Sequence, residues 1–312
     1  MRRPVPSADA DPVPSHPGGV ELLAAREALV AGTAVRRALP RRGRRTVGAW
    51  CFADHFGPAP VSPDAPVAIG PHPHTGLQTV TWLLEGEQRH RDSLGSDQVI
   101  RPGQLNLMTA GAGVVHAEES LDFRGRIHGV QLWVALPDTV RASPPSFEHV
   151  AELPSVALGA AVATVLVGSL AGVTSPAGVH SPILGADLRV GPGTAGLPLE
   201  PAFEHAVLVL EGAVEVEART VAPGTLAYLG PGRHDLALRA GSPARALLLG
   251  GPPFGEPLLM WWNFVARTRE ELGAARRAWV EGDDRFGAVV SGLDRMPAPG
   301  LPWASGRGQG DG

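Results

Sequence analysis

Residues 71–76 read PHPHTG and residues 113–118 read GVVHAE, and these two segments carry the strongest signal in the chain. Each holds two potential metal ligands two residues apart: His72 and His74 in the first, His116 and Glu118 in the second. Successive side chains of a β-strand point to opposite faces, so residues two apart share a face. If both segments are strands, the four side chains can meet in one interior. Three imidazoles and one carboxylate suit a transition metal, Fe(II) first, with Mn, Co, Ni, Cu or Zn as alternatives.

The composition is that of a globular, strand-rich protein. With 312 residues the chain can form one large or two medium domains. The 44% apolar and 19% charged residues exclude a disordered chain, and 40 Gly with 31 Pro favour many short strands joined by tight turns. A net charge of -4 gives no reason to expect direct nucleic acid binding.

Lysine is absent and cysteine occurs once, which excludes several kinds of chemistry. Without lysine there is no Schiff-base residue and no P-loop lysine. The single Cys51 cannot form an intramolecular disulfide, and its aromatic neighbours predict a buried strand residue. No signal-type segment and no long apolar run occurs, so we expect a cytoplasmic protein without membrane contact.

The pattern along the chain predicts two β domains. Residues 1–18 are rich in Pro, Ser and Asp and are expected to be a disordered leader, followed at 20–30 by a short helix or an edge element. Short apolar segments bounded by turn residues predict an N-terminal metal-binding domain over 35–137. A connector over 138–160 and a second β domain over 161–265 follow. An amphipathic helix over 266–282 and an extended or frayed tail over 283–312 complete the chain.

The second domain repeats the first without its histidine pair. Residues 82–86 (WLLEG) reappear as 208–212 (LVLEG), and 102–105 (PGQL) as 223–226 (PGTL). Extending the first offset places Pro198 and Glu200 where His72 and His74 stand. One copy is therefore expected to hold the site and the other to act as its scaffold.

Several other polar residues are weaker candidates. Arginines between 36 and 45 could form a phosphate- or DNA-contacting patch, but without a base-reading motif a solvated loop is the preferred interpretation. His90 and His128 could be pocket groups or lie behind the ligands, but a solvated or hydrogen-bonded role is favoured for both. Gln78 and Gln131 could donate to a substrate oxygen. Asp54 and His55 are adjacent, so on a strand they point to opposite faces and do not form a catalytic pair.

Four segments together resemble the pirin family of the cupin superfamily: 71–76, 79–86, 108–118 and 129–134. The resemblance covers roughly residues 39–262 and implies an all-β fold of two cupin barrels packed face to face, with a single non-haem iron in the N-terminal barrel. Carried over by position, His72, His74, His116 and Glu118 fall on the family's metal ligands. Gln78 departs from the usual Glu, which raises the question of hydrogen bonding near the metal.

The resemblance implies two functions of different classes. Similar members cleave flavonols such as quercetin, which implies a dioxygenase acting on a small phenolic substrate with O₂, with Glu118 as the catalytic base. The alternative is a metal-dependent or redox-sensing regulator that docks on a protein partner, a transcription factor or a metabolic enzyme. A basic patch near the metal would favour the regulator, and residues 36–45 are its candidate segment.

Overall fold

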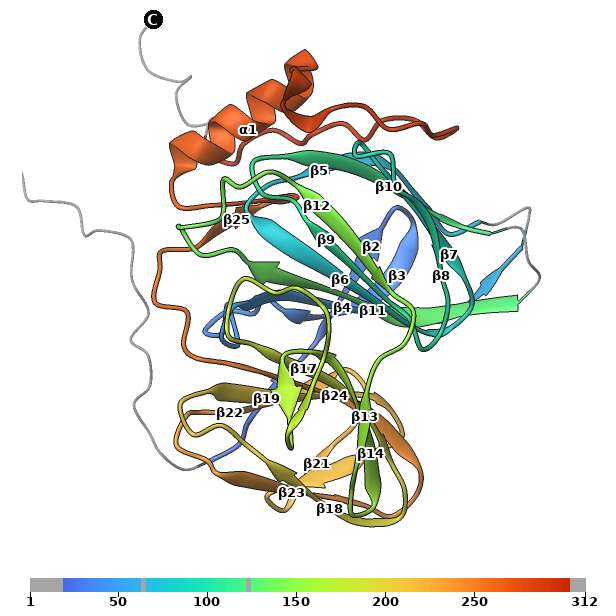
Figure 1. The fold of residues 1–312 in the computed structure, drawn as a ribbon, viewed down its shortest axis with the longest axis vertical. Coiled ribbons are helices and arrows are strands. Elements are labelled where there is room, and N and C mark those ends of the chain that lie inside the picture. Colours follow the sequence, from blue (N-terminus) through green and yellow to red (C-terminus); the bar gives the residue numbers. More distant parts are fainter. Residues whose placement is uncertain (1–18, 63–65, 122–124, 304–312) are drawn as a thin grey trace, which may run out of the picture.

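The computed structural model describes residues 19–62, 66–121 and 125–303, and shows two β-barrels with a helix above the first (Figure 1). The expected leader, 1–18, and the end of the expected tail, 304–312, lie outside the described residues. Within the described ranges no helix is long and apolar enough to cross a membrane.

The first barrel consists of a seven-stranded sheet, ordered β12-β9-β6-β11-β4-β3-β2, facing a four-stranded sheet, ordered β5-β10-β7-β8. All pairings in both sheets are antiparallel. The strands are β2 (Arg26–Val30), β3 (Thr33–Leu39), β4 (Trp50–Val61), β5 (Ala68–His74), β6 (Leu77–Glu85), β7 (Gln88–Asp92), β8 (Asp97–Ile100), β9 (Leu105–Thr109), β10 (Val114–Ser120), β11 (Gly125–Ala135) and β12 (Ser146–Val150).

The second barrel has the same topology, which confirms the internal repeat. Its sheets are ordered β1-β22-β19-β24-β17-β14-β13 and β18-β23-β20-β21, so each strand has a counterpart in the first barrel. The strands are β1 (Glu21–Ala24), β13 (Ser155–Leu158), β14 (Ala161–Val167), β17 (Leu184–Val190), β18 (Gly193–Pro198), β19 (Glu204–Glu211), β20 (Val214–Val216), β21 (Arg219–Val221), β22 (Thr225–Leu229), β23 (Asp235–Ala240) and β24 (Ala244–Gly251). A small hairpin, β15 (Ser169–Leu170) and β16 (Val173–Thr174), joins β14 to β17.

The two large sheets pack face to face, as expected, and form the largest shared core. Trp50 and Trp82 from the first barrel lie in one cluster with Leu208 and Leu249 from the second. The Trp50 indole N–H is shared between the carbonyl oxygens of Leu184 (3.1 Å) and Gly250 (3.2 Å) of the second barrel. These two hydrogen bonds give the apolar contact a fixed register, because a buried indole N–H ordinarily has a partner.

Gln78 bridges the barrels, and its hydrogen bonds among the described residues go to residues other than the four candidate metal ligands. Its amide Nε2 donates to Thr109 Oγ1 and to the Gly178 carbonyl, both at 3.0 Å. Glu204, its counterpart in the repeat, crosses in the opposite direction and accepts the backbone N–H of Gly48 at 2.7 Å. This pair of reciprocal contacts answers the question raised by Gln78: in this chain the residue joins the two domains.

Replacing Gln78 by Leu is expected to lower the free energy of unfolding by about 1–3 kcal/mol, because the buried Thr109 hydroxyl loses its donor and the hydrogen bond to Gly178 of the second barrel is lost. Metal content should stay at the wild-type level. Urea unfolding and elemental analysis test both statements. Gln98→Leu is the control, since within the described part of the chain the Gln98 amide donates only to the neighbouring Val99 carbonyl. Loss of metal from the Gln78 variant alone would contradict this assignment.

The segments between and before the barrels differ from expectation. The helix alternative for 20–30 is wrong: β1 forms an edge of the second barrel's sheet and β2 an edge of the first, as the other alternative predicted. The segment 138–160, expected as a connector, carries β12 of the first barrel and β13 of the second. The proposed domain boundaries remain a prediction.

The arginine segment is also more ordered than a solvated loop. Arg37 lies on β3 and pairs with Asp54 at 2.6 Å. Arg44 is 8% exposed, pairs with Glu21 at 3.0 Å and lies 3.5 Å from the centre of the Tyr228 ring. The loop interpretation is therefore wrong for these residues, because strand pairing and aromatic stacking hold them in place.

The C-terminal segment folds back over the first barrel (Figure 1). It contains β25 (Leu259–Trp261), β26 (Phe264–Ala266), α1 (Arg269–Glu281) and the short 3₁₀ helix η1 (Asp284–Phe286). The helix α1 is amphipathic, as predicted, and buries Leu272, Ala275 and Trp279 in a cluster with Val115 of β10. A Cβ at Gly76 would lie 2.3 Å from the Val265 carbonyl oxygen, so the close approach of this segment requires glycine there.

Candidate metal centre

The four candidate ligands lie on neighbouring strands of the small sheet. β5 carries His72 and His74, and the antiparallel β10 places His116 opposite His72. A bulge after His116 shifts the register, so that Glu118 faces Ile69. All four side chains are buried. The ring centres of His72 and His116 are 4.2 Å apart, and one nitrogen from each histidine lies within 4.8 Å of the others.

Backbone carbonyls orient two of the imidazoles. His72 Nδ1 donates to the Gly70 carbonyl at 2.8 Å, and His74 Nδ1 to the Asn263 carbonyl at 3.1 Å. Each Nε2 is therefore the unprotonated nitrogen that a metal needs. Burial lowers the pKa of His72 to about 4 and that of His74 well below its usual value. Asn263 belongs to the C-terminal hairpin, a contribution that the sequence did not reveal.

His116 is oriented by two hydrogen-bonded side chains, those of His90 and Asp92. Its Nδ1 lies 3.3 Å from Nδ1 of His90, whose Nε2 lies 3.1 Å from Oδ2 of Asp92. Burial, the largest single effect, raises the pKa of Asp92, but its interactions with His90 and its hydrogen bonds with Ser96 together bring it below its usual value. An ionised carboxylate only accepts, so His90 donates from Nε2 and accepts the Nδ1 proton of His116. This leaves His116 Nε2 unprotonated, and it has no hydrogen-bond partner among the described residues.

Sequence reasoning missed Asp92. For His90 it favoured a solvated or hydrogen-bonded role over a place near the pocket; His90 is buried and hydrogen-bonded behind His116. The sequence signal for Asp92 was its spacing of two residues from His90, which places both side chains on one face of β7. His90 also forms a second close group with His116 and Glu118, with one ligand atom of each within 4.8 Å. Burial raises the pKa of Glu118. The structure thus offers two overlapping sets of ligands that share His116.

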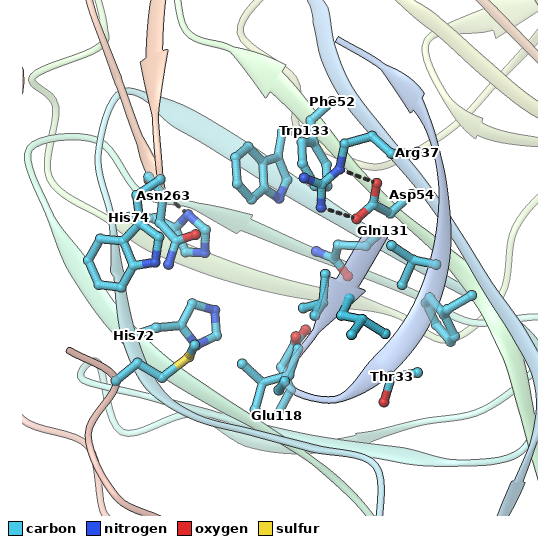
Figure 2. A pocket seen from close by; sticks show the side chains of 18 of the residues that line it. Thr33, Arg37, Phe52, Asp54, His72, His74, Glu118, Gln131, Trp133 and Asn263 are labelled. Atoms are coloured by element: carbon cyan, nitrogen blue, oxygen red, sulfur yellow. Dashed lines mark hydrogen bonds and ion pairs between the residues drawn. The ribbon is translucent and has the colours of Figure 1, made fainter. Parts of the chain in front are cut away.

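A cavity of about 440 Å³ opens beside these residues (Figure 2). His72, His74, His116 and Glu118 contribute to its wall. Phe52 and Trp133 stack with ring centres 4.0 Å apart and form an aromatic side of the cavity. The hairpin of β2 and β3 lines another part, and Asn263 and Met296 bring the C-terminal segment to it. Its volume is typical of small-molecule sites.

Of the remaining sequence candidates, some line the cavity and others lie outside it. Gln131 lines the cavity, whereas His55 and His128 contact each other at 2.7 Å outside it. Asp54 faces the cavity while its neighbour His55 does not, as strand alternation predicted. Cys51 is buried, also as predicted, and burial raises its pKa to about 12.

The second barrel has an apolar interior where the first has histidines. On β18 and β23, the counterparts of β5 and β10, Leu197 pairs with Leu236 and both are buried. These residues belong to a continuous apolar cluster inside the barrel. The second barrel therefore offers apolar packing here. Pro198 and Glu200, which the repeat offset placed at the positions of His72 and His74, are exposed, so the inward-facing residues are one position away from the predicted ones.

Comparisons with known proteins agree with this architecture. A family model described as Pirin matches residues 32–134, and one described as Pirin C-terminal cupin domain matches 186–287. A Pseudomonas aeruginosa protein named "Putative quercetin 2,3-dioxygenase" is 48% identical over 95% of each chain. A "Pirin-like protein" of Caulobacter vibrioides is 40% identical over 80% of this chain and 88% of its own. The solved structure of a quercetin 2,3-dioxygenase from Acinetobacter baumannii is 43% identical, with TM-score 0.88, covering 91% of this chain and 96% of that one.

Proposed function

Because this chain belongs to the pirin family of the cupin superfamily, we propose that it is a mononuclear non-haem iron dioxygenase that opens flavonol-type phenolic substrates with O₂. The observation that carries the proposal is the meeting of three buried imidazoles beside an aromatic-walled cavity of small-molecule size. The names of the similar proteins support the substrate class.

The residues fit a metal. His116 Nε2 is buried without a hydrogen-bond partner among the described residues, although a buried polar atom ordinarily has one. The Nδ1 bonds of His72 and His74 leave their Nε2 lone pairs unprotonated. We propose that these three histidines and Glu118 hold Fe(II). The same ligands could also bind Mn, Co, Ni, Cu or Zn.

When bound, the iron would supply the redox chemistry with O₂ that no side chain provides. The protein's own residues bind and orient the substrate. Phe52 and Trp133 offer a flat apolar face to a planar ring system. Glu118 lies in the cavity wall, where it can take the proton of a substrate hydroxyl at a carboxylate oxygen. The buried walls exclude bulk water from that proton.

The chain from Asp92 through His90 to His116 predicts a strong effect of Asp92→Asn. Oδ1 of Asp92 accepts the backbone N–H groups of Leu94 and Ser96, so the asparagine oxygen will stay there and its NH₂ will face His90. His90 then donates from Nδ1, and His116 must carry its proton on Nε2. We expect metal affinity to fall about 10- to 100-fold.

Competition with a chelator of known affinity measures this change. Asp97→Asn is the control, because Asp97 lies on the neighbouring β8 and pairs with the exposed Arg89. Equal metal affinity in the wild-type protein and the Asp92 variant would contradict the proposed chain.

The function is tested by oxygen consumption of the anaerobically Fe(II)-loaded protein on addition of quercetin. We expect equimolar loss of O₂ and quercetin. Glu118→Gln should retain the protein's fold and slow the reaction about 10²- to 10⁴-fold, the usual contribution of a positioned base. Iron content is measured on both proteins, so that loss of metal and loss of the base are separated.

No O₂ consumption by fully iron-loaded wild-type protein, with quercetin and its analogues, would contradict the dioxygenase. A basic patch near the metal would favour the regulatory alternative. Of the arginines that could supply it, Arg37 is paired with Asp54 and Arg44 with Glu21, so the observed contacts do not favour that alternative.

A further inference from the structure

The cavity carries a second polar group of side chains, formed by Arg37, Asp54 and Gln131 and called here the distal cluster. A series of ring contacts separates it from the histidines. Trp133 lies edge-on to His74 at 5.1 Å, Phe52 stacks on Trp133 at 4.0 Å, and the Arg37 guanidinium lies 4.4 Å from the Phe52 ring centre. Figure 2 shows Trp133 between His74 and the Arg37–Asp54 pair. The cavity thus has two polar ends joined by an aromatic wall.

The distal cluster has unused hydrogen-bonding capacity. Arg37 donates through Nε and Nη2 to the two carboxylate oxygens of Asp54, at 2.7 and 2.6 Å. Gln131 Oε1 accepts from the Thr81 hydroxyl at 2.9 Å, which fixes the amide. Among the described residues nothing accepts from Arg37 Nη1 or from Gln131 Nε2. Such donors, on residues that line a cavity, are available to a ligand.

The charge of the cluster indicates what kind of ligand it suits. Asp54 is 3% exposed and neutralises Arg37 in a two-point ion pair. A carboxylate on the ligand would meet this carboxylate and gain little from Arg37, which is already paired. Arg26 also lines the cavity near Asp54, but it is exposed, so solvent screens its attraction for a ligand carboxylate. A hydroxyl group has no net charge, accepts from Arg37 or Gln131, and can donate to Asp54.

We propose that the distal cluster recognises hydroxyl groups at the end of an aromatic substrate remote from the histidines, and so selects polyhydroxylated ring systems over aromatic acids. The inference rests on the proposed function, because it assigns the substrate's reacting end to the histidines. Gln131 and Arg37 are then specificity-determining contacts, and Asp54 is a positioning residue that holds Arg37 and cancels its charge.

Ligand affinity, measured without turnover, tests the distal cluster independently of the proposed catalytic activity. Quercetin, which carries two adjacent hydroxyls on its outer ring, is compared with the analogue lacking both and with an analogue bearing a carboxylate there. Quenching of tryptophan fluorescence under anaerobic conditions, on the metal-loaded protein, gives each Kd without turnover. For the wild-type protein we expect quercetin to bind at least about tenfold more tightly than either analogue. A tenfold difference in Kd is what one hydrogen bond to a charged or fixed donor contributes.

Two variants then test the roles. Gln131→Met should weaken quercetin binding about tenfold and leave the unhydroxylated analogue unchanged. Asp54→Asn leaves Arg37 without its counter-charge and should improve binding of the carboxylated analogue relative to quercetin. Asp187→Asn is the matched control, since Asp187 forms the same kind of pair with Arg245 in the second barrel, away from the cavity.

The outcomes are distinct for the two proposals. Equal affinity of the wild-type protein for all three ligands, equal weakening of all three by Gln131→Met, or no binding at all would overturn the distal cluster. Discriminating binding without O₂ consumption would support the cluster and contradict the dioxygenase.

Discussion

His116→Ala is expected to remove the metal, so that elemental analysis finds about one ion per chain in the wild-type protein and almost none in the variant. Three features make His116 the most sensitive position. It faces His72 across the strand pair, its Nε2 has no hydrogen-bond partner among the described residues, and it belongs to both close groups of ligands. Removing it therefore damages either arrangement of the site.

A matched control excludes a general effect of losing a buried histidine. His205 is fully buried in the second barrel, and burial lowers its pKa to about 4. We expect His205→Ala to keep the wild-type metal content. Equal metal in the His116 variant and the wild-type protein, after purification without a chelator or a histidine tag, would leave a bicupin without a metal site at this position.

Trp50→Ala is expected to cause the largest loss of stability, about 3–5 kcal/mol, because Trp50 is fully buried in the core shared by the two barrels. The substitution opens a cavity between the large sheets and also leaves the Leu184 and Gly250 carbonyls without the indole donor. Chemical denaturation followed by circular dichroism measures the change.

Trp50→Phe separates the two contributions. It keeps most of the apolar volume and loses the indole N–H, so a smaller loss of about 1–2 kcal/mol is expected. A Trp50→Ala protein as stable as the wild type would show that the two sheets do not depend on each other for stability.

Much of the fold and of the candidate site could be predicted from local sequence patterns. The alternation of strand side chains is a property of the backbone, so the spacing of His72 and His74, and of His116 and Glu118, predicted that each pair shares a face. The repeat predicted the second barrel, because segments with equal turns and equal apolar patterns form equal strands. The apolar face of α1 was predictable from the 3.6-residue period of its apolar side chains.

The remaining features depend on contacts between distant segments. The carbonyl of Asn263 reaches His74 only because the C-terminal hairpin returns to the first barrel. Arg37 belongs to the cavity only because β3 pairs with β4 and meets Asp54 there. Gln78 left open the hydrogen bonding near the metal and was a candidate donor to a substrate oxygen, but its amide donates across the barrel interface to Gly178. Local periodicity predicts the face on which a residue lies, and tertiary pairing decides what that face meets.

The most direct test of the metal centre is a crystal structure of the anaerobically Fe(II)-loaded protein, with anomalous scattering measured at the iron edge. We predict one peak, bound by Nε2 of His72, His74 and His116 together with a carboxylate oxygen of Glu118. A peak on His90 and Nδ1 of His116, the second close group, would contradict the proposed ligand set, and so would the absence of any peak in the first barrel.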